Sequence, residues 1–152
     1  MNIYFATFGC KVNSGEDQYY LSQLIEHGYR ETSSLDDADI IVINTCAVTE
    51  HAAKKSASYI SKVKSQHEGI KVVVTGCLTE EKGLTLKEYG ADLIVTNGSK
   101  SNLVEHILNM TDGLLKASDG AFAGGALKLK TSTKTRAFFK IQDGCEDRKS
   151  VV

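Results

Sequence analysis

Short apolar runs alternate with helical patterns over the first hundred residues of the chain. Four of the runs are predicted to be strands, at Ile3–Phe8, Ile40–Asn44, Ile70–Thr75 and Asp92–Thr96. The first run is apolar at both odd and even positions, which is typical of a parallel strand covered on both faces. Strands that alternate with helices in this way are typical of repeated βαβ units.

Helical patterns fill the intervals between these strands. Ser14 and Asp17 have capping-box spacing at the start of the first helix, which ends at Gly28, and the third helix ends at Gly90. The residues that we expect to cap the four helix starts are Ser14, Thr49, Thr79, and either Ser99 or Ser101. The pattern therefore predicts an α/β fold: an open, mostly parallel sheet of four to five strands flanked by helices, in the three-layer arrangement of flavodoxin-like and Rossmann-like domains.

The pattern changes after Met110. Residues 111–135 carry scattered glycine, serine, threonine and lysine, which indicates a glycine-rich basic linker or hairpin. Residues 136–142 (RAFFKIQ) form a new apolar run, and we expect it to be a C-terminal strand extension with no helix after it. The chain thus divides into an α/β domain at 1–110, a linker at 111–135 and the start of another domain at 136–152.

Charge divides the chain at the same place. Residues 1–115 have an excess of five acidic residues, whereas residues 116–140 have an excess of five basic residues, within a net charge of −1. A basic segment on an acidic domain can contact nucleic acid. A solvated basic linker accounts equally well for the same composition. The candidates for RNA contact are Lys128, Lys130, Lys134 and Arg136.

No apolar run approaches the roughly 18 to 20 residues needed to cross a bilayer, and the N-terminus lacks the zones of a signal peptide. We therefore expect a cytoplasmic protein with no membrane contact. Disulfides are rare in the cytosol, so the cysteines favour metal or redox chemistry. The four are too far apart for a CxxC motif, so the fold has to assemble any shared site from Cys10, Cys46, Cys77 and Cys145.

Three of the cysteines directly follow predicted strands. Cys10 follows the first in TFGC, Cys46 the second in INTC and Cys77 the third in VTGC. The carboxyl ends of parallel strands meet at one edge of a sheet, where ligands bind, and the nearby helix N-termini favour thiolates. Thiolates are the usual ligands of iron–sulfur clusters, and three of them would leave one iron of a four-iron cluster open.

Other interpretations of these cysteines stay open at this point. Free cysteine is among the most buried residue types, so each could be a core residue. A zinc site would need a fourth ligand, for which His51 is the nearest candidate, and a thiol pair could act as a redox switch. A flavodoxin-like electron carrier is disfavoured, because the loop after the first strand lacks hydroxyl donors for a phosphate and no GxGxxG is present.

Four stretches together resemble the methylthiotransferase branch of the radical-SAM superfamily: TFGCKVN, ADIIVINTCAVTEHA, VVVTGC and TRAFFKIQDGC. The first is most similar to the enzymes that methylthiolate threonylcarbamoyladenosine beside the tRNA anticodon. The resemblance implies an N-terminal α/β domain that precedes a radical-SAM barrel and an RNA-binding domain. It also implies that Cys10, Cys46 and Cys77 hold an auxiliary 4Fe–4S cluster, whose open iron takes the sulfur destined for the substrate.

The chain departs from the family after DGC. There the family has a C-x3-C-x2-C motif for a second 4Fe–4S cluster and S-adenosylmethionine, whereas here only Cys145 fits, because Lys149 and Val152 occupy the other two positions. We therefore expect a truncated chain, inactive alone, with the second cluster and S-adenosylmethionine only in the full-length enzyme. The expected partners are tRNA, the missing radical-SAM domain and a second copy of the chain through the last strand. The alternative function is a non-catalytic RNA- or protein-binding module without a cluster.

Overall fold

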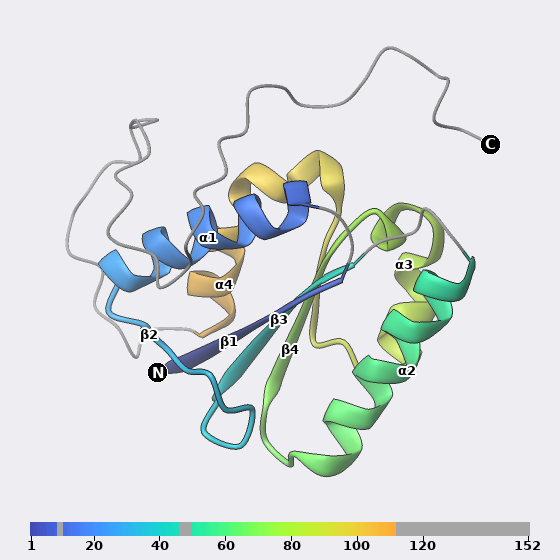
Figure 1. Cartoon of the computed structure of the whole chain (residues 1–152), viewed down its shortest axis with the longest axis horizontal. Helices are drawn as coiled ribbons and strands as arrows, with labels where there is room; N and C mark the ends of the chain where they lie inside the picture. Colours follow the sequence, from blue (N-terminus) through green and yellow to red (C-terminus); the bar gives the residue numbers. More distant parts are fainter. Residues whose placement is uncertain (9–10, 46–49, 112–152) are drawn as a thin grey trace.

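The computed structural model describes residues 1–8, 11–45 and 50–111 (Figure 1). Its elements, in chain order, are β1 (Asn2–Thr7), α1 (Lys11–Glu26), β2 (Arg30–Glu31), β3 (Ile40–Thr45), α2 (Glu50–Gln66), β4 (Lys71–Gly76), α3 (Leu78–Glu88), β5 (Leu93–Val95), the 3-10 helix η1 (Asn97–Asn102) and α4 (Leu103–Met110). In this part of the chain five strands form one parallel sheet in the order β2-β1-β3-β4-β5. That order is the flavodoxin-like one. The predicted α/β fold is therefore confirmed.

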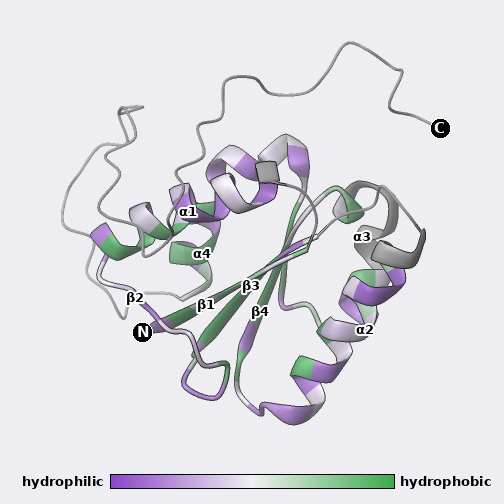
Figure 2. Ribbon diagram, viewed as in Figure 1, coloured by the Kyte–Doolittle hydropathy of each residue, from purple (hydrophilic) through white to green (hydrophobic). Residues whose placement is uncertain are grey.

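Helices cover both faces of the sheet, which is the middle of three layers (Figure 1). One face packs against α1 and α4 through a core that includes Leu24 and Leu103. The other face packs in a second core with residues of α2 and α3, such as Ile60 and Leu86. Successive residues of a strand point to opposite faces, so the residues of β3 enter the two cores in turn. This explains why the body of β3 is apolar throughout, as Figure 2 shows.

The four predicted strands are present, with ends displaced by at most one residue. The sequence pattern missed β2, which pairs with the first residues of β1 at the margin of the sheet. This strand has only two residues, Arg30 and Glu31, and both are exposed. A strand so short and so polar gives no alternating pattern from which it could be predicted.

Two of the predicted helix caps lie inside the helices that they were expected to cap. Ser14 lies inside α1, which already begins at Lys11. Thr79 lies inside α3, where Cys77 takes the N-cap position. The Thr79 hydroxyl instead donates to the carbonyl oxygen of Gly76 at 2.7 Å. A hydroxyl near a helix start can therefore bond backwards to a strand end and need not mark the first residue of the helix.

The fourth helix also begins later than predicted. Ser99 and Ser101 both lie in η1, and Asn102 takes the N-cap position of α4. The predicted cap Thr49 lies outside the described residues, as do the linker beyond Thr111 and the predicted strand extension at 136–142. No helix in the described ranges is long and apolar enough to span a membrane.

Candidate functional site

The carboxyl ends of β1, β3 and β4 lie side by side in the middle of the sheet. Thr7 of β1 pairs with Asn44 of β3, which pairs in turn with Thr75 of β4. The strand order reverses direction between β1 and β3, and open parallel sheets bind their ligands outside the carboxyl ends of the strands at such a switch point. The edge of the sheet beyond these three residues is therefore the candidate functional site.

The structure describes one of the cysteines predicted for this edge. Cys77 is an exposed free cysteine at the N-cap position of α3. Its backbone N–H donates to the carbonyl oxygen of Thr45 at 3.2 Å. Thr45 immediately precedes Cys46 in the chain, so this hydrogen bond joins the strand ends that lead into two of the predicted ligands.

The other cysteines, Cys10, Cys46 and Cys145, lie outside the described residues, as do the basic candidates for RNA contact. Among the residues that are described, no three histidine, cysteine, aspartate or glutamate side chains are grouped so that they could hold a metal ion. His51, the candidate fourth zinc ligand, lies in α2, and its side chain is not described. A shared cysteine site therefore stays a prediction.

A row of polar side chains crosses the ends of the three central strands. Thr7, Asn44 and Thr75 share the face of the sheet that packs against α1 and α4, because they continue the alternation of that core. Asn44 and Thr75 are fully buried. Asn44 Oδ1 and Thr75 Oγ1 are buried atoms that have no hydrogen-bond partner among the described residues. Buried polar groups cost stability unless they are paired, so this row replaces apolar side chains at a cost to the fold.

Asp17 of α1 lies over this polar row. Its carboxylate accepts hydrogen bonds from Thr7 Oγ1 at 2.5 Å and from Asn44 Nδ2 at 2.8 Å. Burial raises the pKa of Asp17 from 3.8 to about 6, although those two bonds and the charge of Lys100 act to lower it. The carboxyl group therefore changes its protonation state in weakly acidic solution, beside the candidate site.

A buried ion pair joins α1 to the segment that follows β5. Glu16 pairs with Lys100 of η1, and the side chains of the two residues are only 8% and 13% exposed. Removing one partner of such a pair leaves a buried charge without its counter-ion, which is strongly destabilising. The pair therefore fixes the position of η1 against the start of α1.

Asn13 connects the ends of β1 and β3. Its Nδ2 donates to the carbonyl oxygen of Phe8 at 3.0 Å and to that of Thr45 at 3.4 Å. Its own carbonyl oxygen accepts a hydrogen bond from Asn44 Nδ2 at 3.4 Å. The sequence pattern did not reveal Asn13, Asp17 and Lys100, because no motif marks a contact between residues so distant in the chain. The available signal was the polar residue at the end of each central strand.

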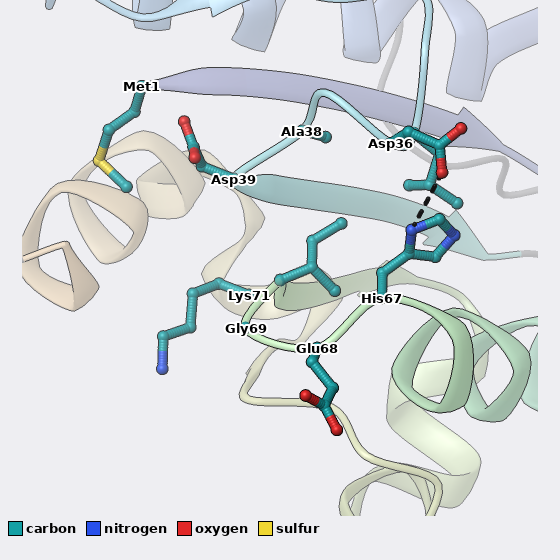
Figure 3. A pocket seen from close by; sticks show the side chains of 10 residues that line it. Met1, Asp36, Ala38, Asp39, His67, Glu68, Gly69 and Lys71 are labelled. Atoms are coloured by element: carbon teal, nitrogen blue, oxygen red, sulfur yellow. Dashed lines mark ion pairs between the residues drawn. The ribbon is translucent and has the colours of Figure 1, made fainter.

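A concave feature lies at the opposite, amino-terminal edge of the sheet (Figure 3). This cavity of about 460 Å³ lies among Met1, the segment before β3 and the loop that leads into β4. His67 Nδ1 lies 3.4 Å from Asp36 Oδ1, a contact drawn as a dashed line in Figure 3. The lining carries both signs of charge, including Glu68 and Lys71, and lies at the end of the sheet remote from Cys77. It is therefore separate from the candidate site.

Comparison with known proteins agrees with the family resemblance of the sequence. Residues 2–98 match the model of a family described as uncharacterized protein family UPF0004. Similar relatives are the threonylcarbamoyladenosine tRNA methylthiotransferase MtaB of Chlamydia pneumoniae (36% identical, covering 90% of this chain and 31% of the relative), the ribosomal protein uS12 methylthiotransferase RimO of Chlamydia felis (32%, covering 96% and 33%), and the tRNA-2-methylthio-N(6)-dimethylallyladenosine synthase of Roseobacter denitrificans (30%, covering 95% and 35%).

This chain therefore spans about a third of the length of the curated relatives that it matches. The relatives include both tRNA and ribosomal-protein enzymes, so the match alone does not distinguish between the two kinds of substrate. The family model covers most of the described α/β domain. The chain belongs to the UPF0004 family, the N-terminal domain of methylthiotransferases.

Proposed function

We propose that this chain is the part of a methylthiotransferase that holds an auxiliary 4Fe–4S cluster through the thiolates of Cys10, Cys46 and Cys77. The observation that carries the proposal is the hydrogen bond from the Cys77 N–H to the carbonyl oxygen of Thr45. It links the strand ends that lead into Cys77 and Cys46, at the edge where parallel sheets bind ligands. Family membership supports the same assignment.

The described residues at this edge fit such a ligand. Cys77 is exposed, so its sulfur can be reached by a ligand that lies outside the sheet. It stands at the start of α3, where the first N–H groups of a helix have no partner within the helix and can donate to inorganic sulfides. When bound by three thiolates, such a cluster offers one open iron that can take a sulfur ligand. In this proposal the chain supplies three thiolate ligands and leaves the fourth iron of the cluster without a protein ligand.

The activity of the complete enzyme is a wider part of the proposal. The names of the relatives describe methylthiolation of tRNA nucleosides or of a ribosomal protein. The motif TFGCKVN favours a tRNA substrate, a modified adenosine near the anticodon, and thus a location in the cytoplasm. Sulfur insertion and methylation would then also need a radical-SAM domain with a second cluster and S-adenosylmethionine. Cys145 corresponds to the first ligand position of that domain.

The test is anaerobic reconstitution of the 152-residue chain with ferrous iron and sulfide. We expect about four irons and four sulfides per chain. Each of the three single variants, with Cys10, Cys46 or Cys77 changed to serine, should bind less iron. The matched control Cys145→Ser should bind as much iron as the unaltered chain. An iron content that stays unchanged in the three cysteine variants would contradict the proposal.

RNA binding without iron would instead favour the alternative function, a binding module that uses the basic segment. In that case the affinity for tRNA should fall steeply with salt. The salt dependence should weaken when Lys128, Lys130 and Lys134 are neutralised together. Iron uptake and salt-dependent RNA binding are measured separately, so the two functions can be distinguished on one preparation.

A further inference from the structure

The geometry points to Asn13 as a positioning residue that fixes the ends of β1 and β3 relative to each other. This inference rests on the proposed function, because the segments that follow these ends carry Cys10 and Cys46. Asn13 is 7% exposed and lies in α1, four residues before Asp17. Hydrogen bonds of Asn13 reach the two strand ends, and the inference is that it acts through them.

Within residues 1–8 and 11–45, the backbone bonds between β1 and β3 can be followed as far as Phe8. The last of them runs from the Phe8 N–H to the carbonyl oxygen of Asn44 at 2.8 Å. Beyond it, the carbonyl oxygens of Phe8 and Thr45 both accept from the side-chain amide of Asn13. One side chain therefore continues the connection between the two strands past the end of the sheet.

The Thr45 carbonyl oxygen is shared between two donors. It accepts the Asn13 side-chain amide and also the backbone N–H of Cys77. Through this atom the Asn13 side chain is tied to the ends of β3 and β4, and through the Phe8 carbonyl oxygen it is tied to the end of β1. These are the three strands whose ends lead into Cys10, Cys46 and Cys77.

Asn13 is itself held in place by its neighbours. Asn44 Nδ2 donates both to the Asn13 carbonyl oxygen and to Asp17, which accepts from Thr7 of β1 as well. The bonds form a closed ring in which β1, α1 and β3 are each connected to the other two. An amide is needed at position 13, because it carries two N–H donors for two carbonyl oxygens and no charge.

The consequence is a defined spacing of the two strand ends, Phe8 and Thr45. Phe8 precedes Cys10 by two residues, and Thr45 precedes Cys46 directly. A displacement of either carbonyl group is therefore transmitted to a cysteine within one or two peptide units. Ligand sites tolerate displacements of only about 0.5 Å. The positions of the strand ends therefore affect how well the cysteines can bind a shared ligand.

The test has one arm that needs no iron. In a chain with Cys77→Ser and Cys145→Ser, only Cys10 and Cys46 remain as thiols. The rate of cross-linking by dibromobimane, which fluoresces only after both of its ends have reacted, then reports their spacing. We expect Asn13→Ala to slow cross-linking about tenfold, because the effective molarity of two groups falls steeply when they are misplaced. Asn13→Gln, which keeps both donors on a longer arm, serves if Asn13→Ala fails to fold, and it should slow the reaction less.

The matched control is Leu24→Ala, which destabilises the same helix through its buried face but contacts neither strand end. It should cross-link at the parent rate despite a lower melting temperature. Equal rates in the Asn13 variants and the parent, or equal slowing by Leu24→Ala, would overturn the inference.

The second arm uses the chain with all four cysteines after iron loading. Loss of iron to a chelator should be about tenfold faster in Asn13→Ala and unchanged in Leu24→Ala, in line with the usual effect of residues that orient metal ligands. If Asn13→Ala loses iron at the same rate as the unaltered chain, Asn13 does not position the ligands. If the unaltered chain takes up no iron, the proposed function is wrong, and the cross-linking arm still decides the role of Asn13.

Discussion

A Cβ atom on Gly76 would stand only 2.2 Å from the carbonyl oxygen of Thr45. Gly76 also has a φ of +100°, a conformation that residues with a side chain rarely adopt. The same close approach lets the next residue, Cys77, donate its N–H to that oxygen. Gly76 therefore allows the ends of β3 and β4 to approach each other closely. Both its backbone angle and the lack of space around it require glycine.

Replacing Gly76 by alanine should therefore destabilise the domain strongly. We expect a loss of about 3 kcal/mol or more in the free energy of unfolding, because backbone strain and a clash with backbone atoms add together. Urea unfolding followed by circular dichroism measures this loss directly.

Two other glycines allow the effect of backbone strain to be separated from the effect of the clash. Gly69 has a φ of +86°, but a Cβ added there would meet nothing within 4 Å, so Gly69→Ala should cost only about 1 kcal/mol. At Gly98 a Cβ also meets nothing within 4 Å and the backbone angle is ordinary, so Gly98→Ala should be close to neutral. If Gly76→Ala costs no more than Gly69→Ala, the contact with Thr45 is not as close as described.

The buried carboxyl group of Asp17 should make stability depend on pH. Its pKa in the folded state, about 6, lies above the ordinary 3.8, so protonation favours folding. This contribution is fully present below about pH 4 and is lost as the pH rises to about 6. A pKa raised this far contributes about 3 kcal/mol in full, of which about 2 kcal/mol is lost between pH 4 and pH 6.

The variant Asp17→Asn isolates this effect, because every other carboxylate is common to both chains. Its side chain can still accept from Asn44 and can donate to Thr7, so the fold should survive. The free energy of unfolding of Asp17→Asn minus that of the unaltered chain should rise by about 2 to 3 kcal/mol from pH 4 to pH 7. A difference that stays flat across this range would show that Asp17 titrates normally.

The ion pair of Glu16 and Lys100 should behave as a buried pair. We expect Lys100→Met to cost about 3 kcal/mol at pH 7, because Glu16 then stays buried without its counter-ion. The double variant with Glu16→Gln should recover much of that loss. Thermal unfolding of the two single variants and the double variant measures the coupling, and simple additivity would mean that the pair contributes little.

The exposed thiol of Cys77 should react with N-ethylmaleimide in the native chain, because labelling requires an accessible sulfur. After loading with iron and sulfide, the same thiol should react at least about tenfold more slowly if it is a ligand. Mass spectrometry of the Cys77 peptide gives both rates, with Cys77→Ser as the control for assignment. Equal rates before and after loading would remove Cys77 from the proposed ligand set.

Much of the fold could be predicted from the sequence because β3 and β4 are buried on both faces and β1 is partly buried. The unbroken apolar runs at β1, β3 and β4 cannot be confused with an exposed element, and helix patterns separate them. The misses were local. The strand β2 is too short to show a period, and hydroxyl residues such as Ser14 and Thr79 near helix starts gave false caps.

The candidate site was predictable only as an edge of the sheet. The position of Cys77 after a parallel strand followed from the pattern, but the order of the strands in the sheet and the contacts made by Asp17 did not. Its spacing from Ser14 suggested a local capping role, whereas its actual partners, Thr7 and Asn44, belong to two different strands. Such partners depend on how α1 lies across the sheet, and a periodic pattern does not specify that angle.

The marginal strands of the sheet matter for how the domain behaves when it is concentrated. An unpaired strand edge is a template for a neighbouring chain, and long flat edges lead to aggregation. Here β2 has two residues and β5 has three, and the exposed pair in β2, Arg30 and Glu31, is charged. Both margins therefore offer little backbone for a second copy to extend. The exposed thiol of Cys77 therefore lies at one end of a sheet whose margins do not favour the addition of a strand from a second copy.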